Sequence, residues 1–343
     1  MTTFSPAYAA ALGRIIDPAG QPIDGKGPLA PPADNPLGAA PRPLGGAVLE
    51  TGVKVIDLYA PLVRGGLSGM WSQPKVGKLV AIEELIQRAG SLRGAPSIVL
   101  GLEEHTYDIK DLMVALEEGG AHLYVAMIFC RGADGAAALQ RTLAAGLELA
   151  AQALADGRDA LLFIDADLAA ALDLEPLRQA AAAGGYPQGA ALTSVIFGSD
   201  DRPPAEIERL RLDGSLRFSG ELAAQNIWPA IDPLASESAA LRQDAPLVSS
   251  EHVALVQQAR EVLRQLDTLP AASGEAARGR KLRLFQSQPF FVAESFSAVP
   301  GEYVSLAQTI ADVAAILAGA ADDLPEEALR FSGSLGPLLG QPA

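Results

Sequence analysis

Hydrophobic positions along the chain alternate between short runs and helical stripes from residue 47 onward. The short runs are apolar and partly β-branched, as buried strands are. Between several of them, apolar residues recur at helical spacing, most clearly over 79–88 and 135–155. This alternation predicts an α/β domain over 47–234, with a mostly parallel sheet and helices on both faces. The predicted strands are 67–71, 97–100, 124–129, 160–164 and 193–197.

The two ends of the chain have different patterns. Residues 1–27 are punctuated by turn residues and are expected to be extended, and 28–46 contain so many prolines and glycines that neither a packed helix nor a central strand fits. We therefore expect 1–46 to be an N-terminal extended segment and Pro/Gly-rich connection. After about residue 234 no strand pattern remains, which predicts a helical C-terminal domain over 235–343. The helical patterns there cover 250–267, 304–317 and 325–329.

Charge and composition restrict the partners. The chain has 26 basic and 41 acidic residues, a net charge of -15, which argues against nucleic acid or an anionic membrane surface as a partner. The single cysteine, Cys130, excludes an internal disulfide and suits a reducing compartment. Neither a membrane-length apolar run nor a signal sequence is evident. We therefore expect a cytoplasmic protein without direct membrane insertion.

The segment between the strand at 67–71 and the following helix carries the main candidate chemistry. It reads Ser72-Gln-Pro-Lys-Val-Gly-Lys-Leu79, a partial match to the phosphate-binding loop G-x-x-x-x-G-K-[S/T]. In an intact loop, backbone N–H groups surround a phosphate at a helix N-terminus, and the last hydroxyl binds magnesium. Gly77 and Lys78 are kept, whereas the first glycine and the hydroxyl residue are replaced. The candidate nucleotide-contacting residues are Ser72, Lys75, Val76, Gly77, Lys78 and Leu79.

A second motif lies downstream. Leu161-Leu-Phe-Ile-Asp165 is an apolar strand that ends in a carboxylate, the arrangement known as Walker B, in which the acid lies near the metal. Two interpretations are open: Asp165 is an acid of a magnesium site, or it caps the turn that follows the strand.

Longer segments resemble a known family, the catalytic β subunit of rotary (F-type) ATP synthases. Thr51-Gly-Val-Lys-Val-Ile-Asp-Leu-Tyr-Ala-Pro61, Ile227-Trp-Pro-Ala-Ile-Asp-Pro-Leu234 and Gln286-Ser-Gln-Pro-Phe-Phe-Val-Ala-Glu294 look like landmarks of that family in the same order. The resemblance covers roughly residues 13–335. It implies a RecA-like P-loop NTPase domain followed by a small helical bundle, and ATP or ADP with magnesium as ligands. The chain starts near the point where the family's N-terminal β-barrel ends, so we expect that barrel to be absent.

The resemblance also implies roles for individual residues. Lys78 corresponds to the phosphate lysine and Glu104 to the carboxylate that polarises the attacking water, so these two are the catalytic candidates. Asp165 and Asp108 correspond to acids around the magnesium ion. Three aromatic rings correspond to the adenine pocket, with core packing as the competing interpretation: Trp228, Phe290 and Phe296.

The chain departs from the family where the chemistry is most demanding. Pro74 removes one amide donor from the loop, and Leu79 cannot ligate magnesium. His105, Ala169 and Gly220 stand where the family has arginines. Since phosphoryl transfer depends on positioning and on stabilisation by metal, lysine and arginine, fast turnover is not expected.

Three hypotheses follow. The first is a pseudo-ATPase or weak nucleotide binder with a degraded Walker A motif, acting as a scaffold through protein–protein contacts. Its partner would be an α-subunit-like protein, or further copies of the chain, in a ring. The alternative is a slow Mg-ATP-hydrolysing ATPase that needs an arginine supplied in trans by a partner subunit. A ligand sensor that uses the same pocket is the third.

Overall fold

The computed structural model describes residues 6–30, 34–38, 46–103 and 106–340. By contacts between residues, the chain forms two compact units. The first comprises 1–46, 64–71 and 79–212, and the second comprises 47–63, 72–78 and 213–343. Both units are therefore assembled from separated stretches of chain. The domain boundaries that the sequence predicts, after residues 46 and 234, remain a prediction.

The first unit contains a parallel sheet. Within it, six strands follow the order β1-β6-β5-β7-β8-β4, and each neighbouring pair is parallel. Five of them (β4 to β8) are buried almost throughout, as expected for strands covered on both faces. The strands are β1 (Arg14–Ile16), β4 (Leu67–Trp71), β5 (Ser97–Leu102), β6 (Val125–Cys130), β7 (Ala160–Asp165) and β8 (Leu192–Gly198).

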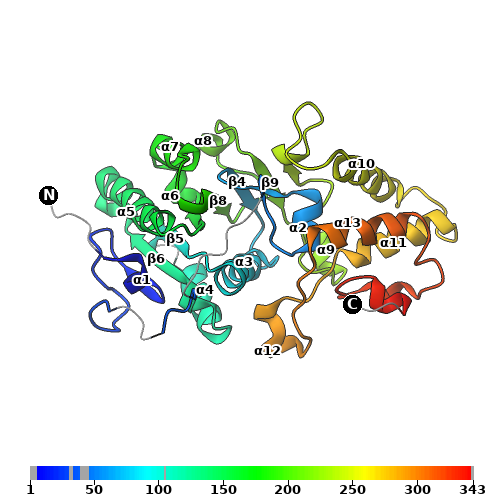
Figure 1. Ribbon diagram of the computed structural model, residues 1–343, viewed down its shortest axis with the longest axis horizontal. Helices are drawn as coiled ribbons and strands as arrows, with labels where there is room; N and C mark the ends of the chain where they lie inside the picture. Colours follow the sequence, from blue (N-terminus) through cyan, green and yellow to red (C-terminus); the bar gives the residue numbers. More distant parts are fainter. Residues whose placement is uncertain (1–5, 31–33, 39–45, 104–105, 341–343) are drawn as a thin grey trace. The chain divides into compact units, whose positions relative to one another are not determined.

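Helices cover both faces of this sheet. Helices α3 and α4 lie on one side of the strands and α5, α6 and α7 on the other (Figure 1). Helix α5 packs closely: a Cβ added at Gly146 would lie 2.8 Å from a methyl group of Leu100 on β5. The helices are α1 (Tyr8–Ala11), α3 (Lys78–Arg93), α4 (Thr106–Glu118), α5 (Ala136–Ala155), α6 (Ala166–Ala170), α7 (Glu175–Ala182) and α8 (Ala205–Glu208), with 3₁₀ turns η2 (Ala121–Tyr124), η3 (Gly132–Asp134) and η4 (Pro187–Gly189).

The core of the first unit lies between the sheet and α5, α6 and α7. Apolar side chains at alternate positions of the central strands, including Ile98, Leu162 and Ile164, meet Leu143 and Leu149 of α5 there. This arrangement is why short apolar runs separated by amphipathic helices form the sheet: each run has both faces buried, and each helix buries one stripe.

The second unit is mainly helical. Helices α10, α11 and α13 pack against one another, and α13 also packs against α2. Each of the three long helices starts directly after a serine whose Oγ accepts a backbone N–H of the first turn, namely Ser249, Ser273 and Ser305. The helices are α2 (Lys54–Tyr59), α9 (Gly220–Ala224), α10 (Ser250–Gln265), α11 (Gly274–Phe285), α12 (Glu294–Ser297) and α13 (Leu306–Leu317), with 3₁₀ turns η5 (Ala239–Leu241), η6 (Phe291–Ala293), η7 (Glu326–Leu329) and η8 (Gly336–Leu339).

Two short antiparallel pairs complete the second unit. Strand β2 (Val48–Leu49) pairs with β3 (Leu62–Val63), and β9 (Gly214–Arg217) pairs with β10 (Glu237–Ser238).

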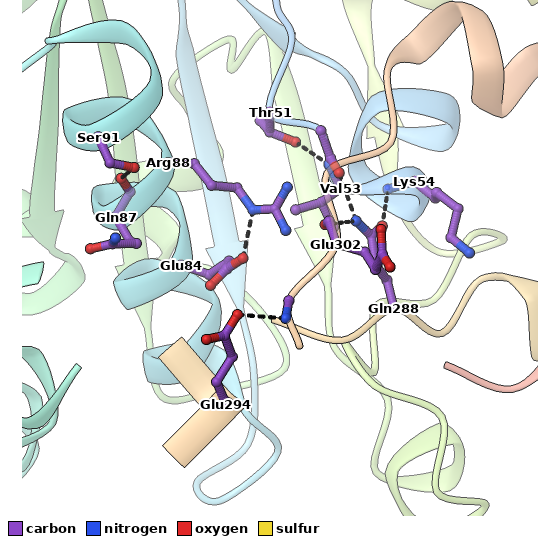
Figure 2. A network of polar contacts seen from close by, with 12 residues as sticks. Thr51, Val53, Lys54, Glu84, Gln87, Arg88, Ser91, Gln288, Glu294 and Glu302 are labelled. Atoms are coloured by element: carbon purple, nitrogen blue, oxygen red, sulfur yellow. Dashed lines mark hydrogen bonds and ion pairs between the residues drawn. The ribbon is translucent and has the colours of Figure 1, made fainter. Parts of the chain in front are cut away.

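A network of polar contacts connects distant parts of the second unit (Figure 2). The Gln288 side chain accepts a hydrogen bond from the Lys54 backbone N–H at 2.8 Å, and its Nε2 donates to the carbonyls of Gly52 and Glu302 at 2.8 and 2.6 Å. One buried amide therefore joins the start of α2 to the segment before α13.

The structure confirms the predicted α/β class, the five predicted strands and the helical C-terminal part, with element ends shifted by one or two residues. Two expectations were wrong in detail. Residues 1–27 are not wholly extended, because Tyr8–Ala11 forms the helical turn α1. Strand structure also continues past residue 234, because Glu237–Ser238 pairs with β9.

Candidate functional site

The candidate phosphate loop lies between a buried strand and a long helix. Strand β4 ends at Trp71 and α3 begins at Lys78, so the intervening six residues form the connection. The backbone takes positive φ at Lys75 (67°) and at Gly77 (88°). Strand, loop and helix follow the order of a phosphate-binding loop, and Lys78 lies at the helix N-terminus, where the backbone favours an anion.

The side chains of this loop offer less than its backbone. Ser72 is fully buried, and its Oγ donates to the Gln73 carbonyl at 2.7 Å, so the hydroxyl stabilises the loop itself. Pro74 and Lys75 are exposed, whereas Val76 and Lys78 are buried. Leu79, half-buried in the first turn of α3, brings only carbon atoms to the position of the magnesium-ligating hydroxyl.

Trp228 lies against the loop. A Cβ added at Gly77 would be 2.8 Å from Cζ3 of the Trp228 ring, so only a glycine allows this approach. The indole Nε1 donates to Asn226 Oδ1 at 3.2 Å. The structure thus brings together two residues that the sequence assigned to one ligand site. Because one side of the Trp228 ring packs on Gly77, that side is not open to a ligand.

Asp165 lies at the carboxyl end of β7, as predicted. It is paired with Phe197, which in turn is paired with Met70 of β4, so Asp165 and the end of β4 lie at the same edge of the sheet. Asp165 Oδ1 accepts hydrogen bonds from the N–H groups of Asp167 at 2.9 Å and Leu168 at 3.2 Å. These are the contacts of a helix N-cap, which the second interpretation of this residue anticipated.

The remaining candidates are placed only in part. Glu104 lies outside the described residues. Asp108 falls within α4 and Phe296 within α12, but the structure does not describe their side chains. Phe290 is buried and precedes the 3₁₀ turn η6, a position compatible with core packing.

One ion pair at the same sheet edge was missed from the sequence. Arg131 Nε lies 2.7 Å from Glu103 Oε2. The two residues directly follow Cys130 and Leu102, which are paired in register on parallel strands. Since carboxyl ends of neighbouring parallel strands meet, the oppositely charged residues at these two strand ends were the signal that could have predicted the pair.

The charge of α3 is reduced by a buried carboxyl group. Burial, with the negative charges of Glu84 and Glu118 adding to it, raises the pKa of Glu83 to about 8. One residue on, Glu84 forms an ion pair with Arg88 at 2.6 Å (Figure 2). Near neutral pH, Glu83 is therefore mostly protonated, and the first turns of α3 repel an anion less than their sequence indicates.

Among the residues that the structure describes, Leu79 and Asp165 fit a magnesium ion poorly. Magnesium prefers oxygen ligands in octahedral geometry, yet Leu79 supplies none and Asp165 Oδ1 already caps α6. Across the part of the chain that the structure describes, no group of three or more acidic, histidine or cysteine side chains could hold a metal. A phosphate fits better, since the start of α3 and Lys78 are kept.

Within the described ranges, no helix combines the length and apolar composition needed to cross a membrane. Comparison with protein-family models gives one match: residues 52–188 match the ATP synthase alpha/beta family, nucleotide-binding domain. The matched range contains the loop at 72–78, Asp165 and four strands of the parallel sheet, β4 to β7. The match is to the alpha/beta family as a whole and does not separate its two kinds of subunit. This part of the chain is thus similar to the nucleotide-binding domain of the ATP synthase alpha/beta family, in keeping with its P-loop-like α/β fold.

Proposed function

We propose that the chain is an ATP synthase β-subunit-like pseudo-ATPase, which binds ATP or ADP weakly or not at all and acts as a scaffold through protein–protein contacts. One observation carries the proposal: the connection between β4 and α3 keeps the strand–loop–helix order of a phosphate loop, while Leu79 stands where its magnesium ligand would be. Pro74 and the contact between Trp228 and Gly77 support it, because the first removes an amide donor and the second places a ring against the loop.

The proposed partner is an α-subunit-like protein, or further copies of this chain, in a ring. The support is the match to a family whose name joins alpha and beta chains. The chain's strong negative charge agrees with a protein partner rather than nucleic acid. We also propose a cytoplasmic location.

Calorimetric titration with Mg-ATP and Mg-ADP tests the nucleotide part of this proposal. We expect a Kd of about 1 mM or weaker, which corresponds to a binding free energy of about -4 kcal/mol or less negative. Lys78→Ala should change neither folding nor the assembly state measured by light scattering. Lys26→Ala is the matched control, since that lysine is exposed and pairs only with a surface carboxylate in the contacts described. Micromolar, magnesium-dependent binding that Lys78→Ala removes would refute the proposal.

A slow ATPase is the second candidate, and the position of Lys78 at the first residue of α3 favours it. In this case a partner would supply an arginine in trans. Hydrolysis of Mg-ATP by the isolated chain and by the chain with an α-subunit-like partner distinguishes the two. A rate that appears only with the partner and is lost in Lys78→Ala would support the enzyme.

A further inference from the structure

A pocket of about 260 Å³ lies in the first unit, between α6, the start of α7 and α8. These helices lie together in Figure 1. The lining residues do not include any of the loop at 72–78. Its floor is apolar, with Ala169, Leu174 and Ile207 buried. Pockets for drug-sized ligands measure about 300–1,000 Å³, so this one suits a single side chain or a group of similar size.

The rim of the pocket is acidic. Asp173, Glu175 and Glu206 line it together with Arg178, so its charged lining residues are three carboxylates and one guanidinium. All three of these acidic residues are exposed. The chain as a whole also carries a net charge of -15. A cation is therefore the ligand that the local and the overall charge favour.

Hydrogen bonds from α5 hold this rim in place. The Gln140 side chain donates to the Asp173 carbonyl at 3.1 Å and accepts from the Asp173 N–H at 3.2 Å. Asp173 Oδ1 in turn accepts from the Glu175 N–H at 3.0 Å, where α7 begins. The backbone between α6 and α7 is thus fixed before any ligand arrives, which lowers the entropic cost of binding.

We propose that this pocket receives one lysine or arginine side chain of a partner protein. The aliphatic stem lies on the apolar floor, and the cationic head reaches the rim carboxylates, as such amphipathic side chains do elsewhere. A simple inorganic cation gains nothing from the floor, and a nucleotide is too large and has the wrong charge. The inference rests on the proposed scaffold function only in assuming a protein partner.

Methyl-detected NMR of the full chain tests the pocket directly, because Ala169, Leu174 and Ile207 supply methyl groups to its floor. The probe is N-acetyl-arginine amide, and N-acetyl-glutamine amide is its neutral match. We expect the arginine amide to shift these methyl signals in a saturable way. The neutral amide should bind about two- to fivefold more weakly, the range for an exposed charge contact. Equal shifts with both probes, or none at these methyls, would overturn the proposal.

A rim variant and a matched control complete the test. Glu206→Gln should weaken binding of the arginine amide about two- to fivefold, while Glu148→Gln, an exposed carboxylate on α5, should not change it. Thermal melting of both variants shows whether the fold is kept. Tighter binding of 1,4-diaminobutane than of the arginine amide would assign the pocket to a free amine and overturn a protein partner. Nucleotide titration and light scattering test the proposed scaffold function separately. A failure of that proposal can therefore be distinguished from a failure of the pocket proposal.

Discussion

Position 79 shows what a single side chain contributes to a phosphate loop. Leu79→Thr would place an oxygen in the first turn of α3, where an intact loop has its magnesium ligand. We expect nucleotide binding in the presence of magnesium to strengthen about tenfold, equivalent to about 1.4 kcal/mol. Leu79→Val is the control, since valine has the shape of threonine without its oxygen. Calorimetry with and without magnesium should separate the variants, and identical behaviour of the two would contradict a magnesium role at this position.

Gly77 is constrained both by its backbone and by a neighbouring ring. Gly77→Ala would put a Cβ 2.8 Å from Trp228 at a residue with φ of 88°. We expect a loss of about 1–3 kcal/mol in the free energy of unfolding, measured with urea. Adding Trp228→Leu should recover part of the loss, because it removes the clash and leaves the backbone strain. Full stability of Gly77→Ala would show that the ring does not pack on the loop.

At the residue scale, the sequence predicted which residues belong to the candidate site better than it predicted what each of them contacts. The loop motif located Gly77 and Lys78, and the strand-end pattern located Asp165. The ring of Trp228 on Gly77 could not be foreseen, because the two are far apart in sequence and no local pattern encodes the contact. The sequence also could not decide whether Asp165 caps a helix or binds a metal, because a carboxylate at the end of a strand can do either.

Helix α3 carries a titratable group that makes stability depend on pH. The pKa of Glu83 is raised by burial from its ordinary value near 4.5 to about 8. The folded state therefore holds a proton that the unfolded state releases between these values, and stability falls as pH rises from about 4.5 to 8. In Glu83→Gln, we expect the free energy of unfolding to decrease by about 2–4 kcal/mol less than in the wild type over this pH range.

Urea unfolding of the wild type and of Glu83→Gln at pH 5, 6.5 and 8 provides the measurement. Glu148→Gln is the control, because that carboxylate is exposed on α5. If the wild type and Glu83→Gln show the same pH profile, the carboxyl group is not protonated in the folded state.

The strands and long helices were predictable as elements because each buries a repeated apolar pattern. Strand β4 has the bounds expected from its apolar run, and β5 to β8 differ by at most two residues at either end. Short elements such as α1 and β10 were not predictable, since they have too few residues to show a repeated apolar pattern. Strand β10 exists only because it pairs with β9, a tertiary contact.

At the scale of the molecule, a buried lysine ties the second unit together. Lys54 is 2% exposed, and its Nζ donates to the carbonyls of Ser332 at 2.7 Å and Gly333 at 3.0 Å. The ammonium also lies 3.8 Å from the centre of the Phe285 ring. Residues near the start and the end of this unit are therefore joined by one side chain.

This lysine should make the unit more stable in alkali. Burial lowers the pKa of Lys54 from 10.5 to about 7, so between these values the unfolded state holds more protons and stability rises with pH. We expect the free energy of unfolding of the wild type, relative to that of Lys54→Met, to rise by about 2–4 kcal/mol between pH 7 and 9.5, since Glu83 contributes equally to both proteins. Urea unfolding at both pH values measures it. A difference between the two proteins that stays constant over that range would contradict a buried, uncharged amine.

The interleaving of the two units has a consequence for how the protein is made. Helix α2 belongs with α10, α11 and α13, yet the strands and helices of the first unit lie between them in the chain. At about 5–20 residues per second, a ribosome reaches α10, the first of these helices, roughly ten seconds or more after finishing α2. During that interval the buried side of α2 has no companion helices, so the nascent chain offers chaperones a binding segment that is covered only after α10, α11 and α13 follow.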